Sequence, residues 1–565
     1  MQIAVVHGYL LRGTGSNLYV SNLCRELCRA GHQVSLFCQE SRPDENDFVV
    51  RGEEFSEDNI STTTIFEKET PFPGECVFYK PNLGGLLPVY VYDNYPGYTV
   101  KELTDLSEED IERYLAANTA ALRTVFAKNP PELILSQHSI MQPIYAARAR
   151  RKADIQNKSR HLMTVHGSAL NFSVRKSKLL RDYALEGIGD ADGIVFVSNH
   201  SINEFTEFFD DLPEVGKKCR VIPAGVNTEI FNPLNNSEEK KERIAGLVEV
   251  LNQSNDSEGG GLTEVKRESF RNKIKEARNA GEIKKLMQEF SDGNDIWKRD
   301  DDAAERLAAI DWEKEKVILF YGKYMFTKGI HLIIGAAPLI LREFPETRFV
   351  FVGYGTARAY MEALVSLLEE KNIELALKML NEPSSFNPAD AEITGSFTKG
   401  LSDELKDSLP DPMGDNNNNT SAFDGKISGR FIFTGIMNHS QLNQMIPCAD
   451  ICLFPSVFPE AFGMVGVEAL SCGVLPLQTY HSGFADVTDV YKKEFAPEYE
   501  KANQKTLYAD EELSINIARN AINFLRYYED INEKKRADIR KRAHNLAEEK
   551  YAWHSIAAKF TEKQF

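Results

Sequence analysis

Short apolar segments alternate with amphipathic helical segments along most of this chain, and this alternation constrains the fold more than any other feature. In the first part, the candidate strands are Ile3–Val6, Val34–Phe37, Leu133–Ser136, His161–Val165, Ile194–Val197 and Arg220–Ile222. Strands that are apolar on both faces are typical of a parallel sheet that helices cover on both sides. The first strand, the helix that ends at Ala30-Gly31-His32 and the second strand make one βαβ unit.

The same alternation starts again after residue 312. The candidate strands of this second part are Val317–Phe320, Phe349–Val352, Phe431–Thr434, Ile451–Phe454 and Val474–Leu477. Helical segments such as Ile330–Leu341 lie between them. The sequence therefore predicts an α/β protein with two doubly wound, Rossmann-like domains. We place the first over residues 1–234 and the second over residues 312–545.

A polar stretch over residues 235–311 separates the two alternating parts. It contains two apolar stripes with the helical spacing i, i+3, i+4 and i+7, which are Ile244, Leu247, Val248, Leu251 and Ile283, Leu286, Met287, Phe290. The Gly/Ser-rich segment Ser254–Gly261 lies between them. We interpret residues 235–311 as a helical insertion at the hinge, not as a third enzymatic domain. A second insertion, residues 384–428, is irregular, carries Asn416–Asn419 and is expected to be a surface loop.

Composition and charge exclude several classes of protein. With 42% hydrophobic and 27% charged residues, the 565-residue chain is neither collagen-like nor wholly disordered. It carries 66 Lys and Arg against 84 Asp and Glu, a net charge of −18, which disfavours sequence-independent binding to nucleic acid. No apolar stretch approaches the roughly 18 residues that span a membrane, and no signal-peptide pattern precedes the strand at Ile3. We expect a soluble, cytoplasmic protein.

The segment from Pro455 to Glu468 is the most informative candidate site. It follows the strand Ile451–Phe454 and leads into a helix that we expect to begin near Gly463. Backbone N–H groups at the start of such a helix point at an anion, which here suits a diphosphate. Glu460, just before the helix, and Glu468, about two turns into it, would then bind hydroxyl groups of a sugar or ribose. An ordinary capped helix with solvated glutamates explains the same spacing equally well.

Two further strand-to-helix junctions are candidates for phosphate binding. In Gly322-Lys323-Tyr324-Met325-Phe326-Thr327-Lys328-Gly329, two lysines would neutralise a phosphate leaving group, although solvated lysines fit as well and the order is not that of a Walker A loop. The turn Gly13-Thr14-Gly15-Ser16-Asn17 lets the backbone approach a ligand closely. It lacks the third glycine of the dinucleotide fingerprint, because Leu18 stands there. An NAD-dependent oxidoreductase is therefore disfavoured.

Histidine and basic residues complete the set of candidates. His166 directly follows the strand that ends at Val165, at the sheet edge where such folds bind ligands; a purely structural histidine is the alternative. The eight cysteines include no Cys-x-x-Cys pair, and we predict no metal site. Two basic runs would meet an anionic acceptor or lipid headgroups, or are simply solvated; they are Arg148, Arg150, Arg151, Lys152 and Arg175, Lys176, Lys178, Arg181.

Together these segments resemble the family 4 retaining glycosyltransferases of the GT-B fold. The most specific match runs from Glu460 through Glu468 into Ala469-Leu470-Ser471-Cys472-Gly473-Val474-Leu475-Pro476. Further matches are Val221-Ile222-Pro223-Ala224-Gly225-Val226-Asn227 with Phe231 and Pro233, Phe351-Val352-Gly353-Tyr354-Gly355, and Ala449-Asp450. The resemblance covers most of the chain outside the two insertions. It implies two Rossmann-like domains that face each other across a cleft.

The resemblance also implies roles for individual residues. Catalytic roles fall to His166, Lys323, Lys328 and Glu460, with Lys323 standing where the family usually has arginine. It implies that the donor is bound by Gly13, Gly15, Gly322, Phe462, Gly463, Met464, Val465 and Glu468. The last helix, over residues 546–565, resembles the family segment that crosses back to pack on the first domain.

The reaction implied is transfer of a hexosyl unit from a UDP- or GDP-sugar to an acceptor hydroxyl, on a sugar or a lipid-linked acceptor, with retention of configuration. No cofactor or metal is expected, and peripheral contact with a membrane is compatible with the basic runs. Two alternatives remain open from the sequence. One is a GT-B nucleotide-sugar enzyme of the epimerase type, and the other is a catalytically silent nucleotide-sugar-binding protein.

Overall fold

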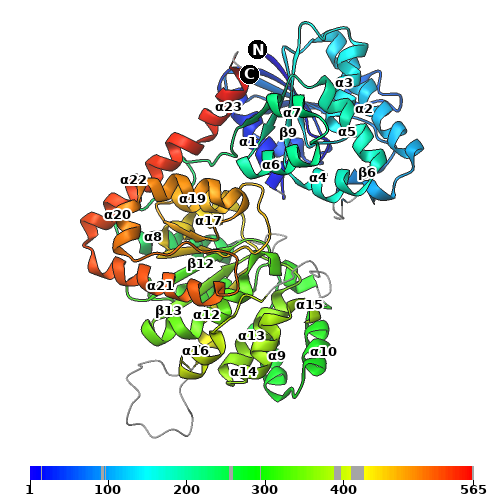
Figure 1. Cartoon of the computed structure of the whole chain (residues 1–565). Helices are drawn as coiled ribbons and strands as arrows, with labels where there is room; N and C mark the ends of the chain where they lie inside the picture. The colour runs from blue at the N-terminus through cyan, green and yellow to red at the C-terminus, as the bar shows by residue number, and fades with distance from the viewer. Residues whose placement is uncertain are drawn as a thin grey trace, which may run out of the picture. The chain divides into compact units, whose positions relative to one another are not determined.

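The computed structural model describes residues 1–13, 15–90, 95, 97–253, 259–292, 294–386, 396–408 and 426–562. The chain divides into two compact units, Met1–Asn227 with Tyr551–Phe565, and Thr228–Lys550 (Figure 1). We call them the first and the second unit. Each contains one main β-sheet, so each can be described by itself.

The first unit is built on a nine-stranded sheet in the order β11-β10-β9-β8-β1-β2-β5-β3-β4. All neighbouring strands in it run parallel except β3 and β4, which are antiparallel. A separate two-stranded sheet pairs β6 with β7. The strands are β1 (Gln2–Val6), β2 (Gln33–Phe37), β3 (Val49–Phe55), β4 (Thr62–Glu67), β5 (Glu75–Lys80), β6 (Leu86–Val89), β7 (Thr99–Glu102), β8 (Leu133–Gln137), β9 (Arg160–Val165), β10 (Gly193–Phe196) and β11 (Cys219–Val221).

Most helices of the first unit connect its strands, as the βαβ pattern predicts; α23 comes from the end of the chain and connects none. They are α1 (Gly15–Arg29), α2 (Glu108–Lys128), α3 (Gln142–Lys152), α4 (Ser168–Phe172), α5 (Lys178–Asp190), α6 (Asn199–Phe208), α7 (Pro213–Lys218) and, from the end of the chain, α23 (Trp553–Thr561). The indole of Trp553 lies so close to Gly225 that a Cβ there would be only 2.5 Å from it. The Arg160 guanidinium donates to the carbonyl oxygen of Phe560 at 2.9 Å. These contacts fix α23 to the first unit.

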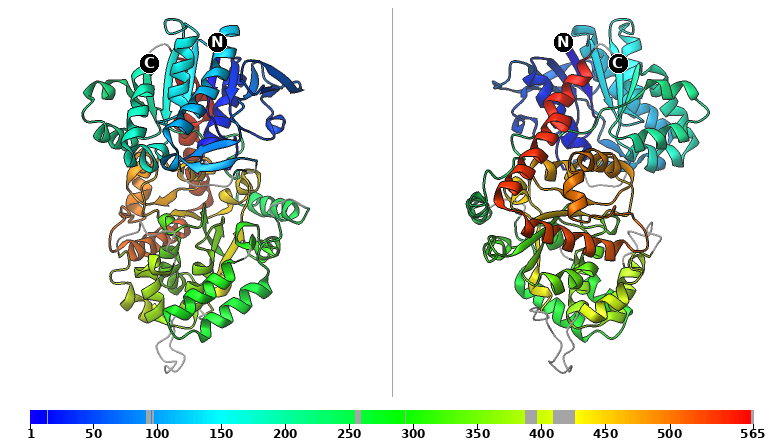
Figure 2. Two further views of the ribbon diagram at one scale, coloured as in Figure 1. Left: turned by 90° about the vertical axis from the view of Figure 1, so that its right-hand side faces the viewer. Right: turned by 60° about the vertical axis from the view of Figure 1, so that its left-hand side comes forward.

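The second unit contains a five-stranded sheet in the order β14-β13-β12-β15-β16, in which all pairs are parallel. Helices cover both of its faces (Figures 1 and 2). The strands are β12 (Lys316–Tyr321), β13 (Thr347–Val352), β14 (Phe431–Gly435), β15 (Ile451–Phe454) and β16 (Pro476–Gln478). The helices outside the insertions are α12 (Ile330–Glu343), α13 (Arg358–Glu369), α14 (Ile373–Asn381), α17 (His439–Met445), α18 (Met464–Ser471), α19 (Ser482–Glu494), α20 (Ala496–Lys501), α21 (Leu513–Asp530) and α22 (Glu533–Tyr551).

The predicted fold class, an α/β protein with two doubly wound, mainly parallel sheets, is confirmed. One strand lies later than predicted: β16 begins at Pro476 instead of Val474. Gly473 adopts φ 79°, and the N–H of Val474 donates to the Ala469 carbonyl at 2.9 Å. Val474, which was predicted to begin the strand, therefore belongs to the turn that ends α18. The strands β3, β4, β5, β6 and β7 are absent from the predicted set. The hairpin strand β4 is polar and largely exposed, so it lacks the apolar pattern.

The first insertion is helical, as predicted, and lies within the second unit. It contains α8 (Glu239–Gln253), α9 (Glu264–Glu276), α10 (Ala280–Ser291) and α11 (Ala303–Ala308). The stripe residues Ile244, Leu247 and Leu251 are buried, and so are Ile283 and Met287. The helix α9 was missed, although Phe270 and Ile274 on it are buried. Residues 254–258 of the predicted break lie outside the described residues.

The second insertion is less irregular than predicted. It includes most of α15 (Pro383–Phe386) and all of α16 (Leu401–Ser408), whose Leu401 and Leu405 side chains are buried. The prediction of an irregular loop is therefore wrong for the residues 401–408, because two apolar side chains four positions apart give α16 a face to bury. The segment Asn416–Asn419 lies outside the described residues.

A buried ion network fixes the first insertion to α13. Arg358, 1% exposed, donates to Asp300 and to Glu362 at 2.9 Å each. Asp300 also pairs with Arg267 of α9 and with Arg306 of α11, at 2.8 Å each. Because every carboxylate in the network faces more than one guanidinium, the charges are paired in the interior rather than left alone. The network holds Asp300, in the segment between α10 and α11, against α13.

Candidate functional site

The candidate residues of the second unit follow the carboxyl ends of parallel strands. The loop after β12 carries Lys323 and Lys328, and the loop after β15 carries Glu460. Because β12 and β15 are neighbours in the sheet, the two loops emerge at the same edge. This edge is where doubly wound sheets bind ligands.

The structure brings Lys328 and Glu460 into direct contact. Lys328 Nζ lies 2.5 Å from Glu460 Oε1, with the two side chains 34% and 17% exposed. The same oxygen accepts a hydrogen bond from Ser456 Oγ at 2.9 Å. A half-buried carboxylate is thus held beside a half-buried ammonium group at the mouth of the sheet. Of the two predicted lysines, only Lys328 is placed against this carboxylate, because the Lys323 side chain is exposed to solvent.

The backbone of the two loops explains this placement. Gly329 adopts φ 69°, and a Cβ there would come closer than 2.5 Å to the carbonyl oxygen of Pro455. The N–H of Val457 and the Oγ of Ser456 both donate to the Thr327 carbonyl, at 2.9 Å each. Only glycine fits between the loops, so the residue after Lys328 must be one without a side chain. The ion pair therefore rests on a fixed backbone junction.

A third loop, after β16, holds Glu460 from the other side. The N–H of Glu460 donates to Ser482 Oγ at 2.8 Å, and its carbonyl accepts from the N–H of Gly483, also at 2.8 Å. His481 Nε2 bonds the Ser456 carbonyl at 2.7 Å. Sequence analysis missed Ser456, His481 and Ser482. The sequence feature that could have identified His481 and Ser482 is that they also follow a strand, β16, at this same edge.

The helix α18 begins where predicted, directly after Gly463. Gly463 is its N-cap residue with φ 93°, and a Cβ there would come closer than 2.5 Å to the Phe484 ring. The N–H of Gly466 donates to the Gly463 carbonyl at 3.1 Å, and the N–H groups of Met464 and Val465 have no acceptor one turn earlier within the helix, as at any helix start. Phe462 is buried, while Met464 and Val465 are half-buried. An anion placed at this end would meet both the N–H groups and the positive end of the helix dipole.

Glu468 lies in the second turn of α18 and is only 8% exposed. Burial raises the pKa of its carboxyl group, and the charge of His439 on α17 opposes part of this rise. Such a carboxyl group takes up a proton more readily than a solvated one, so it is suited to hydrogen bonding with hydroxyl groups. Glu468 is thus buried and Glu460 half-buried, which argues against both being solvated glutamates.

Close packing of glycines joins the loops after β12 and β13. Gly322 and Gly353 have φ values of 147° and 153°, and a Cβ on Gly353 would come closer than 2.5 Å to the Gly322 carbonyl oxygen. The N–H of Tyr324 donates to the Tyr354 carbonyl at 2.7 Å. Close packing therefore requires glycine at position 353, while the candidate residue Gly322 takes part through its carbonyl oxygen.

In the first unit, His166 follows β9 and is held at the sheet edge. Its Nε2 lies 2.8 Å from Gln137 Oε1, and its ring meets Tyr19 edge-on with centroids 5.0 Å apart. Burial and the nearby His7 lower the pKa of His166 to about 3. The imidazole is therefore neutral at physiological pH. If Gln137 Oε1 accepts, as placed, Nε2 carries the proton and Nδ1 carries the lone pair.

Two further histidines lie beside His166 and were missed in the sequence. His7 follows β1 and His138 follows β8, and β8 lies between β1 and β9 in the sheet. The His138 ring lies 5.1 Å from that of His166 and 6.0 Å from that of His7. Burial lowers the pKa of His7 to about 4 and that of His138 well below its usual value. The signal was the same as for His166, a histidine just after an apolar strand.

The glycine turn of the first unit is open. Gly13 adopts φ 93°, and apart from its chain neighbours no atom of the described residues lies within 4 Å of a Cβ placed there; Gly15 is the first residue of α1. Asn17 holds the turn by donating to the Arg12 carbonyl at 2.7 Å and by contacting His7 Nε2 at 2.9 Å. Thr14 lies outside the described residues.

The basic runs behave differently in the structure. In the first run, Arg148 pairs with Glu112 and Glu186, and the buried Arg150 pairs with Asp190 and Asp192. The positive charge of these two arginines is therefore balanced by carboxylates of the first unit. In the second run the exposed residues are Arg175, Lys176 and Lys178, next to Leu179, which is 36% exposed.

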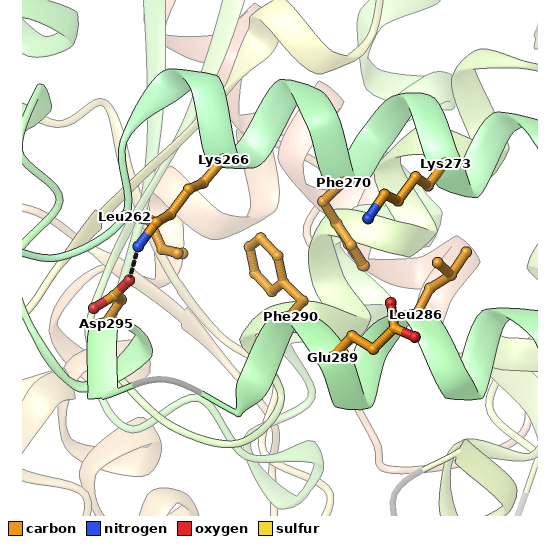
Figure 3. A pocket seen from close by; sticks show the side chains of 8 residues that line it. All are labelled: Leu262, Lys266, Phe270, Lys273, Leu286, Glu289, Phe290 and Asp295. Atoms are coloured by element: carbon orange, nitrogen blue, oxygen red, sulfur yellow. Dashed lines mark hydrogen bonds and ion pairs between the residues drawn. The ribbon is translucent and has the colours of Figure 1, made fainter.

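Two cavities lie away from the predicted site residues. One, of about 240 Å³, lies between α9 and α10, where Phe270 and Phe290 face each other and Lys266 pairs with Asp295 (Figure 3). The other, of about 410 Å³, is lined by residues at the amino ends of β12, β15 and β16, among them Lys316 and Asp450, and by Trp312. Neither lining includes a predicted catalytic or donor-binding residue.

A search of the described parts of the chain finds no group of three or more His, Cys, Asp or Glu side chains arranged to hold a metal ion. In the same residues, no helix is both long and apolar enough to cross a membrane.

Comparison with family models gives two matches. Glycosyl transferases group 1 matches residues 303–382 and 366–524, and Glycosyltransferase Family 4 matches residues 81–230. Together the matches cover well over half of the chain, and the first of them contains Lys323, Lys328, Glu460 and Glu468. None of the curated proteins compared with the chain is significantly similar to it.

Solved structures of similar fold align over nearly the whole chain. Sucrose-phosphate synthase from Thermosynechococcus elongatus is 15% identical, with 99% of this chain and 97% of that chain covered and a TM-score of 0.47. HepE of Anabaena, in complex with UDP-glucose, is 14% identical, with 99% and 98% covered and a TM-score of 0.47. A UDP-forming α,α-trehalose-phosphate synthase from Burkholderia xenovorans, in complex with glucose-6-phosphate, is 12% identical, with 99% of each covered and a TM-score of 0.49.

Proposed function

The chain belongs to the family 4 glycosyltransferases, and from this premise we propose that it transfers a hexosyl unit from a UDP- or GDP-sugar to an acceptor hydroxyl with retention of configuration. The observation that carries the proposal is the Lys328–Glu460 pair beside the start of α18. A cation and the N–H groups of a helix start suit the diphosphate of such a donor, and a carboxylate at the same sheet edge suits the hydroxyl groups of its sugar.

In this proposal the diphosphate binds at the amino end of α18. Breaking the bond between the anomeric carbon and the diphosphate leaves negative charge on the phosphate oxygens. Lys328 and the first N–H groups of α18 stabilise that charge, because fixed donors aimed at a developing anion lower the barrier. Phe462, Gly463, Met464 and Val465 supply the surrounding surface. Lys323 adds a second, mobile charge from the same loop as Lys328.

In this proposal the two glutamates bind different hydroxyl groups of the donor. Glu460, whose backbone and Oε1 are both held, contacts the hydroxyls of the transferred sugar. Glu468, buried in the helix, contacts the ribose. Before the donor binds, Glu460 also holds Lys328 in place, so the ammonium group is already positioned for the phosphate.

We propose the first unit as the acceptor-binding domain, while its Gly13 and Gly15 contribute to binding the donor and its His166 to the reaction at the donor sugar. The neutral His166 offers a hydrogen-bond acceptor at Nδ1 in the tautomer that Gln137 favours. It does not carry the charge that would repel the oxocarbenium-like sugar. The acceptor hydroxyl attacks the anomeric carbon from the face that the leaving phosphate occupies, and the phosphate takes its proton. We assign no step to a metal or other cofactor.

Contact with anionic lipid is proposed for the second basic run only. Its Arg175, Lys176 and Lys178 side chains are exposed beside Leu179, whereas the first run is neutralised within the unit. Basic side chains next to an exposed apolar one are suited to the headgroup region of a membrane.

The test is release of nucleoside diphosphate from a panel of UDP-, GDP- and ADP-sugars, measured with and without candidate acceptors. The proposal predicts that one nucleotide class raises the melting temperature and that its sugar is transferred to an added acceptor. Interconversion of the donor sugar without release would favour an epimerase-type enzyme. Saturable binding with no turnover on any acceptor would favour a silent binding protein, and stabilisation by NAD alone would overturn the proposal.

A further inference from the structure

The first insertion reaches the carboxyl edge of the sheet in the second unit. The N–H of Asp300 donates to the carbonyl of Thr434, near the end of β14, at 2.9 Å. A Cβ on Gly435, the last residue of that strand, would come closer than 2.5 Å to the Lys298 carbonyl oxygen. Residues 298–300 therefore lie directly against the end of β14, and the buried pairing of Asp300 with Arg358 holds them there.

This segment presents an exposed tryptophan at the edge. Trp297 is 44% exposed, and its ring lies 5.8 Å from that of Tyr354, at an interplanar angle of 56°. Tyr354 belongs to the loop after β13. The other tryptophans of the chain, Trp312 and Trp553, are only 6% and 4% exposed. Trp297 is thus the exposed indole of this protein, and it lies beside a second aromatic ring at the sheet edge that binds ligands in this fold class.

The aromatic pair is coupled to the loop that carries the lysines. The Tyr354 carbonyl accepts from the N–H of Tyr324, one residue after Lys323, at 2.7 Å. In the sheet, β13 is separated from β15 by β12 alone. Neighbouring strands lie about 4.8 Å apart, so the loops after β13 and β15 are separated by roughly 10 Å. A nucleotide with its diphosphate near Lys328 can lay its base along the edge toward Tyr354.

We propose that Trp297, supported by Tyr354, is the stacking surface for the nucleobase of the donor. This rests on the proposed function, since it needs a nucleotide at the same edge. Every nucleobase has a flat π-face that stacks on an aromatic side chain, so an exposed indole at this place recognises the base without selecting it by hydrogen bonds. The insertion then has a role in donor binding: it supplies a side chain for the base that the two Rossmann-like sheets do not.

The experiment measures binding of UDP, GDP, ADP and inorganic pyrophosphate to the full chain, by calorimetry and by tryptophan fluorescence. The variants are Trp297→Ala, Trp297→Phe, and Val265→Ala as a matched control, because Val265 is a 76% exposed apolar residue of the same insertion. Trp297 is exposed, so its replacement should leave the melting temperature nearly unchanged.

Trp297→Ala should weaken the binding of the preferred nucleoside diphosphate about ten-fold, while pyrophosphate binds as to the wild type. Trp297→Phe should retain most of the affinity, because a phenyl ring still stacks, but lose the fluorescence change that the nucleotide causes. Val265→Ala should behave like the wild type in both measurements.

The inference is overturned if the wild type binds a nucleoside diphosphate and Trp297→Ala binds it equally well, even if the proposed function stands. An equal loss of pyrophosphate binding would also overturn it, because the defect would then lie at the phosphates. If the wild type binds none of the nucleotides, the proposed function itself fails and the inference falls with it. These outcomes separate the two failures.

Discussion

Replacing Gly463 by alanine should damage both the stability of the second unit and the binding of the donor. Gly463 has φ 93°, and a Cβ would come closer than 2.5 Å to the Phe484 ring. A left-handed conformation costs a residue with a Cβ about 1–2 kcal/mol, and overlap with a packed side chain typically costs about 1–3 kcal/mol. We therefore expect Gly463→Ala to lower the free energy of unfolding by about 2–5 kcal/mol.

The matched control is Gly260→Ala in the same unit. Gly260 has φ 81°, and the nearest atom to its Cβ would be Lys298 Nζ at 3.8 Å, which is ordinary contact. It should lose only about 1–2 kcal/mol, the conformational part. To relieve the overlap at Gly463, the start of α18 has to move, so affinity for the preferred nucleoside diphosphate should fall at least about ten-fold, or 1.4 kcal/mol. Urea unfolding and calorimetry measure both. If Gly463→Ala resembles Gly260→Ala in stability and binds the nucleotide like the wild type, the assignment of this helix end as the diphosphate site is refuted.

Three further predictions follow from the buried and exposed charges. Burial raises the pKa of Glu468, so the protonated form stabilises the fold below the unfolded pKa of about 4.3 and this contribution is lost as the pH rises through the folded pKa. Glu468→Gln should therefore be more stable than the wild type at pH 8, with a smaller difference at pH 5. It should also bind the donor less tightly. If the variant and the wild type are equally stable at both pH values, the burial argument is contradicted. Arg358→Met leaves Asp300 and Glu362 with one guanidinium fewer in the interior, so it should lower the free energy of unfolding by about 3 kcal/mol, measured by urea unfolding. A decrease below about 1 kcal/mol would show that the network is not tightly coupled. Co-sedimentation with anionic vesicles should decrease with salt and with the double substitution Lys176→Glu and Lys178→Glu; absence of binding at low salt would end the lipid proposal.

Much of the fold was predictable because parallel strands buried on both faces leave a simple signal. Ile3–Val6 and Val317–Phe320 are continuous apolar runs, and both lie inside their sheets. The hairpin of β3 and β4 lies at a sheet edge, where a run such as Thr62–Glu67 faces water and needs no apolar pattern. The helix α9 was missed because its mean character is strongly polar, although Phe270 and Ile274 anchor it.

The candidate site was predicted only in part, since sequence spacing places residues at a sheet edge but does not pair them. It placed Lys323 and Lys328 in one loop without showing which of them meets Glu460. The support from Ser456 and Ser482 depends on loops that converge only in three dimensions. The position of Trp297 depends on how the first insertion packs against the end of β14. Because that packing involves residues far apart in the sequence, spacing along the chain does not predict it.

Binding of the donor to Lys328 is the central claim, and a calorimetric titration tests it most directly. The wild type, Lys328→Ala, Glu460→Gln and the control Lys406→Ala, whose lysine is 61% exposed outside the site, are titrated with UDP-, GDP- and ADP-glucose. A charge-assisted hydrogen bond is worth about 1.5–3 kcal/mol. The account predicts that the wild type and Lys406→Ala bind one of these sugars equally well and that Lys328→Ala binds it at least ten-fold more weakly. In a parallel transfer assay, Glu460→Gln should fold normally but transfer little sugar. Unchanged binding by Lys328→Ala, in a protein that binds the donor, would contradict the account.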